Sequence, residues 1–157
     1  MTEFIRSTAK AIILCEGKIL LNRSYTEQLG EFYALPGGGQ HRFEALEDAV
    51  RRECLEETGL HVRVVRLAAV CEEIWTTPAV REEFPEYAHR MLHIFLCETE
   101  DGIPQETPAE TDYGMIEAVW VPLETADTQQ VEPVPLSHRI RDVVAGNTPL
   151  FLGSAFL

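Results

Sequence analysis

The sequence predicts one domain of the α/β (α+β) class, in which helices pack against a mixed β-sheet. Three observations support this prediction. Short apolar runs typical of strands alternate along the chain with two segments of helical composition. The length, 157 residues, fits a single domain over residues 1–157. The apolar share of 45% is large enough to build a core.

The strands are predicted from apolar runs that end at turn-forming residues. Residues 8–14 and 19–23 flank Glu16-Gly17-Lys18 and are expected to pair as a hairpin, because glycine tolerates turn geometry. Residues 62–74 are rich in Val, Leu and Ala, and we expect either one long strand or two short ones. The other predicted strands are 32–35, 91–98 and 116–121.

Two helices are predicted between and after these strands. Residues 43–58 are rich in Ala, Leu, Glu and Arg without internal Gly or Pro, and Gly59 follows as a C-terminal cap. Residues 136–145 place apolar side chains at helical spacing. Residues 76–89 mix Pro, Glu and Arg and are predicted to be a loop. Residues 148–157 are apolar enough to pack on the domain, but their conformation is not predicted.

The chain is strongly acidic. It has 26 Asp and Glu residues against 13 Lys and Arg residues, a formal net charge of −13. Nucleic acids and anionic membranes bind basic surfaces, so we expect neither as a partner. A phosphorylated small molecule remains compatible with this charge, because a bound divalent cation reverses the sign of the local field. No apolar run approaches the roughly 18 residues of a membrane span, and no secretory h-region is present.

The four cysteines form no C-x-x-C pair, which excludes the usual spacing of zinc and redox sites. We therefore expect free buried thiols and a cytoplasmic location, with a disulfide pair as the alternative. These cysteines are Cys15, Cys54, Cys71 and Cys97.

The predicted helix at 43–58 carries acids on its apolar side. On a wheel of about 100° per residue, Glu53, Glu56 and Glu57 share the direction of the apolar stripe. Carboxylates are rarely buried unless they are paired or bind a metal, and three like charges in one turn repel each other. Arg52 can pair with Glu56, but one guanidinium does not neutralise three carboxylates. A hard divalent cation with oxygen ligands would do so, and a surface ion-pair network is the alternative.

Three glycines, Gly37, Gly38 and Gly39, separate a predicted strand from this helix. A glycine-rich turn lets the backbone approach a ligand closely, and its amides and carbonyls can bind that ligand. The three are candidate substrate-binding residues, with a plain turn as the alternative. The run is not a phosphate-binding loop of the G-x-x-x-x-G-K type, because no Lys-Ser or Lys-Thr follows it.

The segment from Gly38 to Leu60 resembles the signature of the Nudix hydrolases, G-x5-E-x7-R-E-U-x-E-E-x-G-U, where U is a bulky aliphatic residue. All seven fixed letters are present at the right spacing. At the two U positions, Leu60 fits and Cys54 departs mildly. Flanking runs also look like the strands around this signature, so the resemblance covers about residues 6–145. It implies a Nudix-type α/β/α sandwich with a mixed sheet and a loop–helix.

The resemblance also implies an activity and a cofactor. Nudix enzymes cut the pyrophosphate of a nucleoside diphosphate linked to another group, with Mg²⁺ or Mn²⁺. One acid, Glu53 or a more distant one, would act as general base for the attacking water. The implied metal ligands are the Gly38 carbonyl, Glu53, Glu56 and Glu57. The implied catalytic residues are Glu44, Arg52, Glu53 and Glu57, of which Glu44 and Arg52 would pair and stiffen the loop–helix junction.

Two further roles remain open. Arg23 is a candidate contact for a substrate phosphate, and a surface ion pair is equally compatible with it. Family members often add a metal-binding acid from a later loop, and a solvated surface charge is the alternative for each candidate here. The candidates are Glu98, Glu106, Glu110 and Asp112.

The whole chain looks most like the bacterial Nudix proteins grouped with ADP-ribose pyrophosphatases. ADP-ribose or a nucleotide sugar is therefore the favoured substrate, and a nucleoside triphosphate, intact or oxidised, is the alternative. A non-catalytic Nudix-fold sensor is a further alternative, although such proteins usually lose signature carboxylates that all remain here. Homodimers are common in the family, so the resemblance also implies a homodimer.

Overall fold

A computed structural model describes residues 4–27, 29–100 and 115–157. Its strands are β1 Arg6–Cys15, β2 Lys18–Thr26, β3 Gly30–Ala34, β4 Gly37–Gly39, β5 Val62–Ile74, β6 His89–Thr99, β7 Met115–Pro122, β8 Val131–Glu132 and β9 Leu150–Phe156. Its helices are α1 Leu46–Thr58, α2 Pro78–Glu83, α3 Leu123–Ala126, the 3₁₀ helix η1 Val134–Leu136 and α4 Ile140–Ala145. Within the described ranges, none of the helices has the length and apolar character needed to cross a bilayer.

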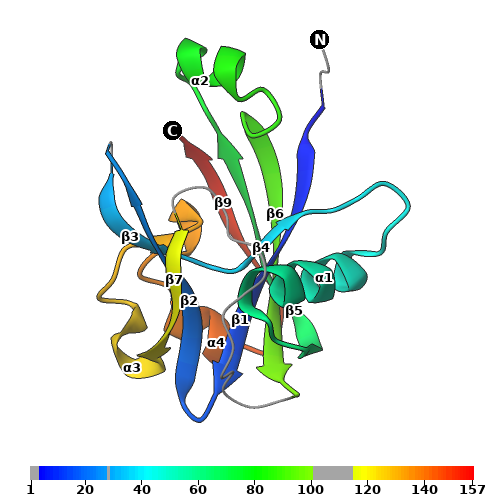
Figure 1. Cartoon of the computed structure of the whole chain (residues 1–157), viewed down its shortest axis with the longest axis vertical. Coiled ribbons are helices and arrows are strands. Elements are labelled where there is room, and N and C mark those ends of the chain that lie inside the picture. Colours follow the sequence, from blue (N-terminus) through cyan, green and yellow to red (C-terminus); the bar gives the residue numbers. More distant parts are fainter. Residues whose placement is uncertain (1–3, 28, 101–114) are drawn as a thin grey trace.

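The strands form one mixed sheet, as the sequence predicts. The order along the sheet is β8-β3-β2-β1-β6-β5-β9, with β4 also paired to β1 and β7 to β2. The pairs β1–β6, β3–β8 and β5–β9 are parallel, and the other pairs are antiparallel. Strand β1 begins, and β9 ends, at the end of the molecule where α2 lies (Figure 1).

Each face of the sheet carries its own apolar cluster, because side chains alternate between the faces along a strand. Ala11 and Ile13 of β1 pack with Val50 and Cys54 of α1 on one face. Ile12 of β1 faces the other way, into the cluster covered by η1, α3 and α4. Helices on both faces of a mixed sheet make an α/β/α sandwich, so the predicted architecture is confirmed.

The centre of the sheet opens between β1 and β2. These two strands pair only next to their turn, at Leu14–Ile19 and Cys15–Lys18. Farther from the turn, β1 pairs with β4, whereas β2 pairs with β3 and β7. The short strand β4 therefore enters where β1 and β2 diverge, and α1 packs beside it (Figure 1).

The first helix is shorter than predicted at its start. The sequence predicts a helix from residue 43, but α1 begins at Leu46, and Phe43 has a left-handed φ of 69° and is 96% exposed. The loop before α1 is fixed by polar contacts instead, since Glu44 accepts a hydrogen bond from the His41 amide at 3.0 Å. At the other end, Gly59 caps the helix in the left-handed region, as predicted.

Other segments also differ from the predictions. Residues 76–89 were expected to be a loop, but they contain α2, which starts at Pro78, where a missing N–H costs nothing. The helix predicted at 136–145 is divided into η1 and α4. The break lies at His138, with φ of 66°, and the Asp127 carboxylate accepts the Ile140 amide hydrogen at 2.8 Å. Strand β5 is one long strand rather than two, and the unassigned tail forms β9.

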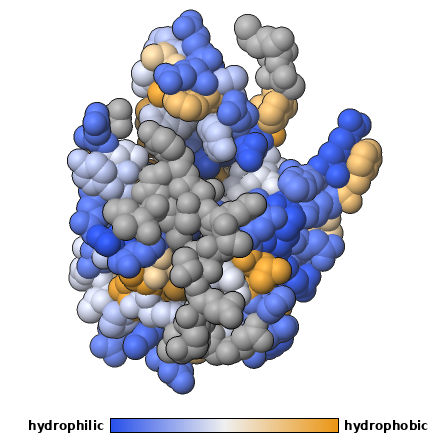
Figure 2. All heavy atoms as spheres, in the orientation of Figure 1, coloured by the Kyte–Doolittle hydropathy of each residue, from blue (hydrophilic) through white to orange (hydrophobic). Residues whose placement is uncertain are grey.

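All four cysteines are free thiols, as expected, and three of them are buried. Burial raises the pKa of Cys71 and Cys97 to about 12, and it also raises the pKa of Cys54. They are therefore core residues rather than reactive nucleophiles. Among the residues that Figure 2 colours, hydrophilic surface predominates, and the apolar patches seen between them are small.

Replacing Gly37 with alanine should destabilise the fold strongly. An added Cβ would lie 2.2 Å from the Ala9 carbonyl oxygen, and φ at Gly37 is 135°. We expect a loss of more than about 3 kcal/mol in the free energy of unfolding, measured by urea denaturation. The matched control is Gly17→Ala, where φ is 74° but nothing lies within 4 Å, so the cost should be only about 1–2 kcal/mol. Equal losses in the two variants would contradict this account.

Candidate active site

Arg52 joins the loop before α1 to the helix itself. Its Nε and Nη2 donate to the two carboxylate oxygens of Glu44 at 2.8 and 3.0 Å. The same Nη2 donates to the Gly39 carbonyl at 2.9 Å. The pair is partly buried, with side-chain exposures of 22% for Arg52 and 16% for Glu44. This forked, charge-assisted pairing is the geometry in which Arg–carboxylate contacts are strongest, and it is the pairing expected from the sequence.

The Arg52 guanidinium lowers the pKa of Glu44 from its ordinary value of 4.5 to about 2. The hydrogen bond from Arg52 is the largest cause, and the hydrogen bond from the His41 amide adds to it. The partnership also raises the pKa of Arg52. Both groups therefore stay charged throughout the neutral and mildly acidic range, and the loop stays attached to the helix there.

The remaining nitrogen of Arg52 reaches the acids of the next turn. Nη1 donates to Glu53 at 2.8 Å and to Glu56 at 3.3 Å. The three acids that were predicted to point inward differ in their exposure in the structure. Glu57 is only 3% exposed, the Glu53 side chain is 15% exposed, and the Glu56 side chain is 37% exposed. Glu56 therefore lies at the rim rather than inside.

Glu57 is held from two other elements. Its Oε2 accepts a hydrogen bond from the Gly37 amide of β4 at 2.9 Å and from Asn22 Nδ2 of β2 at 3.2 Å. The Gly37 carbonyl in turn accepts a hydrogen bond from Lys10 Nζ of β1 at 3.0 Å. The opening between β1 and β2 thus brings a carboxylate of α1 against the glycine-rich strand.

Two of the three glycines make room for charged side chains. A Cβ added at Gly38 would lie 2.6 Å from the Glu53 carboxylate, and one added at Gly39 would lie 2.3 Å from the Arg6 guanidinium. The backbone therefore approaches both charged groups more closely than any other residue would allow. The glycines and the acids of α1, predicted separately to bind ligands, meet at one place.

The donor chemistry of this place suits a hard divalent cation. Glu53 and Glu57 are largely buried carboxylates beside the Gly37–Gly39 backbone, and oxygen ligands of this kind are those that Mg²⁺ and Mn²⁺ prefer. Within the described part of the chain, no three His, Cys, Asp or Glu side chains form a ready cluster for a metal. Arg52 Nη1, bonded to both Glu53 and Glu56, occupies the space between those two acids.

Other predicted residues lie elsewhere. Arg23 makes exposed ion pairs with Glu31 at 3.0 Å and Glu117 at 2.9 Å, which is the surface alternative left open by the sequence. Glu98 pairs with Arg63 at the far end of the sheet. The remaining candidate acids, Glu106, Glu110 and Asp112, lie outside the described residues.

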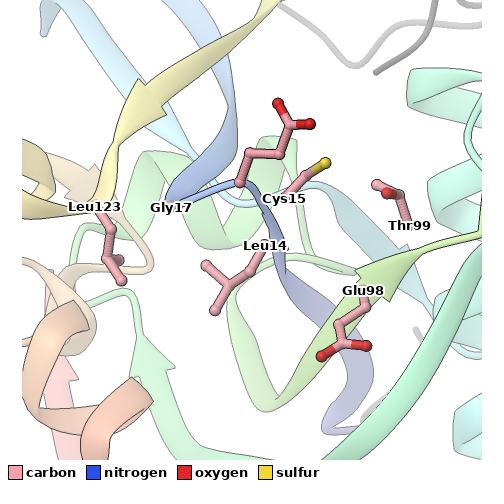
Figure 3. Close-up of a pocket in the computed structure, with 7 residues that line it drawn as sticks. Leu14, Cys15, Gly17, Glu98, Thr99 and Leu123 are labelled. Carbon is pink, nitrogen blue, oxygen red and sulfur yellow. The ribbon is translucent and has the colours of Figure 1, made fainter. Parts of the chain in front are cut away.

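A hollow of about 330 Å³ opens beside the β1–β2 turn (Figure 3). It is lined by Leu14, Cys15, Glu16, Gly17, Glu98, Thr99 and Leu123. This is the closed end of the sheet, where β1 and β2 still pair, whereas β4 joins β1 at residues 8–10. The hollow is therefore separate from the acids of α1.

Sequence reasoning missed Asn22 and Lys10. Asn22 follows the apolar run 19–21 and precedes Arg23, Lys10 lies between two alanines, and neither belongs to a spaced motif. Asn22 is 3% exposed, and buried polar groups in strands need partners. The signal available in the sequence was a polar residue directly after an apolar run of a predicted strand, but its partner, 35 residues away in sequence, becomes visible only in the fold.

Comparisons with known proteins show a known family and fold. The family model described as the NUDIX domain matches residues 5–142. No curated protein matches the chain. A NUDIX hydrolase structure from Nitrosomonas europaea aligns with a TM-score of 0.71 at 18% identity, covering 100% of this chain and 82% of that one.

Two further solved structures carry more specific names. An ADP-ribose pyrophosphatase from Streptococcus suis aligns with a TM-score of 0.60 at 19% identity, covering 94% of this chain and 99% of that one. A MutT NUDIX hydrolase from Burkholderia pseudomallei aligns with a TM-score of 0.58 at 26% identity, covering 93% of this chain and 100% of that one. The first likeness shows a shared fold, and the second adds modest sequence identity.

The pairing of Glu44 with Arg52 predicts an acid-dependent stability. The pKa of Glu44 is lowered on folding, so its stabilising effect is complete above pH 4.5 and is lost as the pH falls towards about 2. Wild type should exceed Glu44→Gln in free energy of unfolding at neutral pH, and this difference should shrink across that range. Urea denaturation at several pH values measures it. Glu47→Gln is the control, because its exposed pair with Arg51 contributes little at any pH. A wild-type advantage that stays constant down to pH 2 would contradict the assignment.

Proposed function

The chain belongs to the NUDIX family, whose members are pyrophosphohydrolases, and on this premise we propose that it hydrolyses ADP-ribose or a nucleotide sugar with a divalent cation. The observation that carries the proposal is the meeting of α1 with β4. There the largely buried acids Glu53 and Glu57 lie beside Gly37–Gly39, with Arg52 and Glu44 fixing the loop between them. A surface ion-pair network would not bury a carboxylate to 3% exposure.

The residues proposed to hold the cation are Glu53, Glu56, Glu57 and the Gly38 carbonyl. When bound, the cation supplies positive charge that offsets the pyrophosphate and makes its phosphorus open to attack. We assign to Glu53 the role of general base, because its carboxylate can accept the proton of the attacking water. Arg52 and Glu44 orient the two acids of the helix by holding the loop and the helix together.

The substrate preference is supported by the overall resemblance to ADP-ribose pyrophosphatase-like proteins and by the structural likeness to one such protein. The alternative is a nucleoside triphosphate, favoured by the 26% identity to a structure named MutT. A non-catalytic sensor is disfavoured, because every carboxylate of the signature is present. The two substrate classes release different products, so one assay separates them.

Incubation of the purified protein with Mg²⁺ and a panel of nucleoside diphosphate derivatives tests this function. We expect AMP from ADP-ribose, or a nucleoside monophosphate from a nucleotide sugar, detected by chromatography. Release of inorganic pyrophosphate from a nucleoside triphosphate would select the alternative substrate. If no panel member is hydrolysed, the proposed enzymatic activity is wrong.

Replacing Glu57 with glutamine should abolish activity without unfolding the protein. The amide keeps the shape but lacks the negative charge proposed to hold the cation, so kcat/KM should fall at least about 100-fold and Mn²⁺ binding should weaken. Steady-state kinetics and electron paramagnetic resonance of free Mn²⁺ measure the two effects. Glu47→Gln, on the exposed side of the same helix, should change neither. Full activity in Glu57→Gln would contradict the assigned role.

Removal of divalent cations should weaken substrate binding. The chain has a net charge of −13, and the acids of α1 repel a phosphorylated ligand unless a cation lies between them. Isothermal titration with a non-hydrolysable analogue should therefore show tight binding with Mg²⁺ and weak binding after treatment with EDTA. Equal affinity in the two conditions would place the substrate away from these acids.

A further inference from the structure

We propose that Asn22 is a positioning residue for Glu57, and that its side-chain amide fixes the carboxylate in the orientation needed to hold the cation. This inference deepens the proposed function and rests on it. Asn22 lies in the middle of β2, a strand that supplies no residue of the signature segment. Among the hydrogen bonds of the described residues, this one joins the Asn22 side chain to the signature segment.

The geometry defines the direction of that hydrogen bond. An ionised carboxylate only accepts hydrogen bonds, so the contact at 3.2 Å must place the Asn22 amide nitrogen, as donor, against Glu57 Oε2. The Gly37 amide donates to the same oxygen at 2.9 Å. Two donors from different strands bind this one oxygen, and together they restrict the rotation of the carboxylate. Because the carboxylate is planar, the direction of its second oxygen is then fixed as well.

Packing alone gives no reason for an amide at this position. Asn22 is 3% exposed, and within the described part of the chain its Oδ1 is buried without a hydrogen-bond partner. A buried unpaired carbonyl oxygen costs about 1–3 kcal/mol, which an aliphatic side chain of similar size would not incur. The contact with Glu57 is the interaction that distinguishes an amide from such a side chain.

The fold explains why β2 can supply this donor. Beyond the turn β2 leaves β1, pairs with β3 and β7, and exposes the Asn22 side chain to the space that β4 and α1 fill. Lys10 of β1 holds the Gly37 carbonyl at 3.0 Å on the other side of that space. Glu57 is therefore held directly by Asn22 of β2 and Gly37 of β4, and Lys10 of β1 holds Gly37 in turn.

The test compares Asn22→Leu and Asn22→Ser with wild type. Leucine lacks a donor, and the serine hydroxyl is too short to reach Glu57. Loss of an outer partner of a ligand typically weakens metal binding about 10–100-fold, so we expect that increase in the Mn²⁺ dissociation constant, measured by electron paramagnetic resonance. The Mg²⁺ concentration for half-maximal turnover should rise equally, while kcat at saturating Mg²⁺ should largely recover.

A metal-free measurement checks the orientation directly. In the nuclear magnetic resonance spectrum of the metal-free protein, the Gly37 amide should shift on substitution of Asn22, because the carboxylate that accepts its hydrogen is no longer fixed. The control is Ser24→Ala, since Ser24 is also buried on β2 two residues away. It should leave the Gly37 resonance and the Mn²⁺ dissociation constant unchanged. Thermal melting defines the temperature range in which each variant is folded, and the other measurements are made within that range.

The outcomes separate this inference from the proposed function. If wild type binds Mn²⁺ and both folded variants bind it with wild-type affinity and an unshifted Gly37 amide, the positioning role of Asn22 is wrong and the proposed function stands. If wild type itself neither binds Mn²⁺ nor hydrolyses any panel member, the proposed function fails, and this inference fails with it.

Discussion

The guanidinium of Arg52 is the contact on which the arrangement of the site depends. Its nitrogens bond Glu44 and the Gly39 carbonyl in the loop, and Glu53 and Glu56 on the helix. One planar cation with several fixed donors can satisfy all of these at once, which a lysine ammonium could not do. The loop before α1 has no regular secondary structure, and Arg52 links its Glu44 and Gly39 directly to the acids Glu53 and Glu56 of the helix.

The second constraint is the divergence of β1 and β2. Because the two strands pair only at their turn, a short strand of three glycines can enter beside β1 and approach α1. The absent side chains matter as much as the present ones, since a Cβ at Gly38 would overlap the Glu53 carboxylate. The negative charges of Glu53 and Glu57 therefore lie beside the backbone of the three glycines. Under the proposed function, the overall charge of −13 is compatible with a phosphorylated ligand, because a bound cation would offset the acids at this place.

Much of the fold follows from local patterns. The hairpin at β1 and β2, the strands β5 and β6, and the end of α1 at Gly59 agree with the sequence predictions. The differences arise from specific contacts and turn geometry that composition and periodicity do not describe. The start of α1 is displaced by the polar contacts of Glu44, and the predicted last helix is divided where the Asp127 carboxylate caps α4. The tail becomes a strand only because β5 offers a free edge.

The sequence by itself placed the glycines, Arg52 and the acids in one continuous segment, and helical periodicity gave the acids a common direction. The tertiary structure decided how those acids differ. Glu57 is buried and held by Asn22 and Gly37, whereas Glu56 remains at the rim. A helical wheel gives the direction of a side chain but not what it meets, and partners such as Asn22 come from strands whose divergence is a property of the whole sheet.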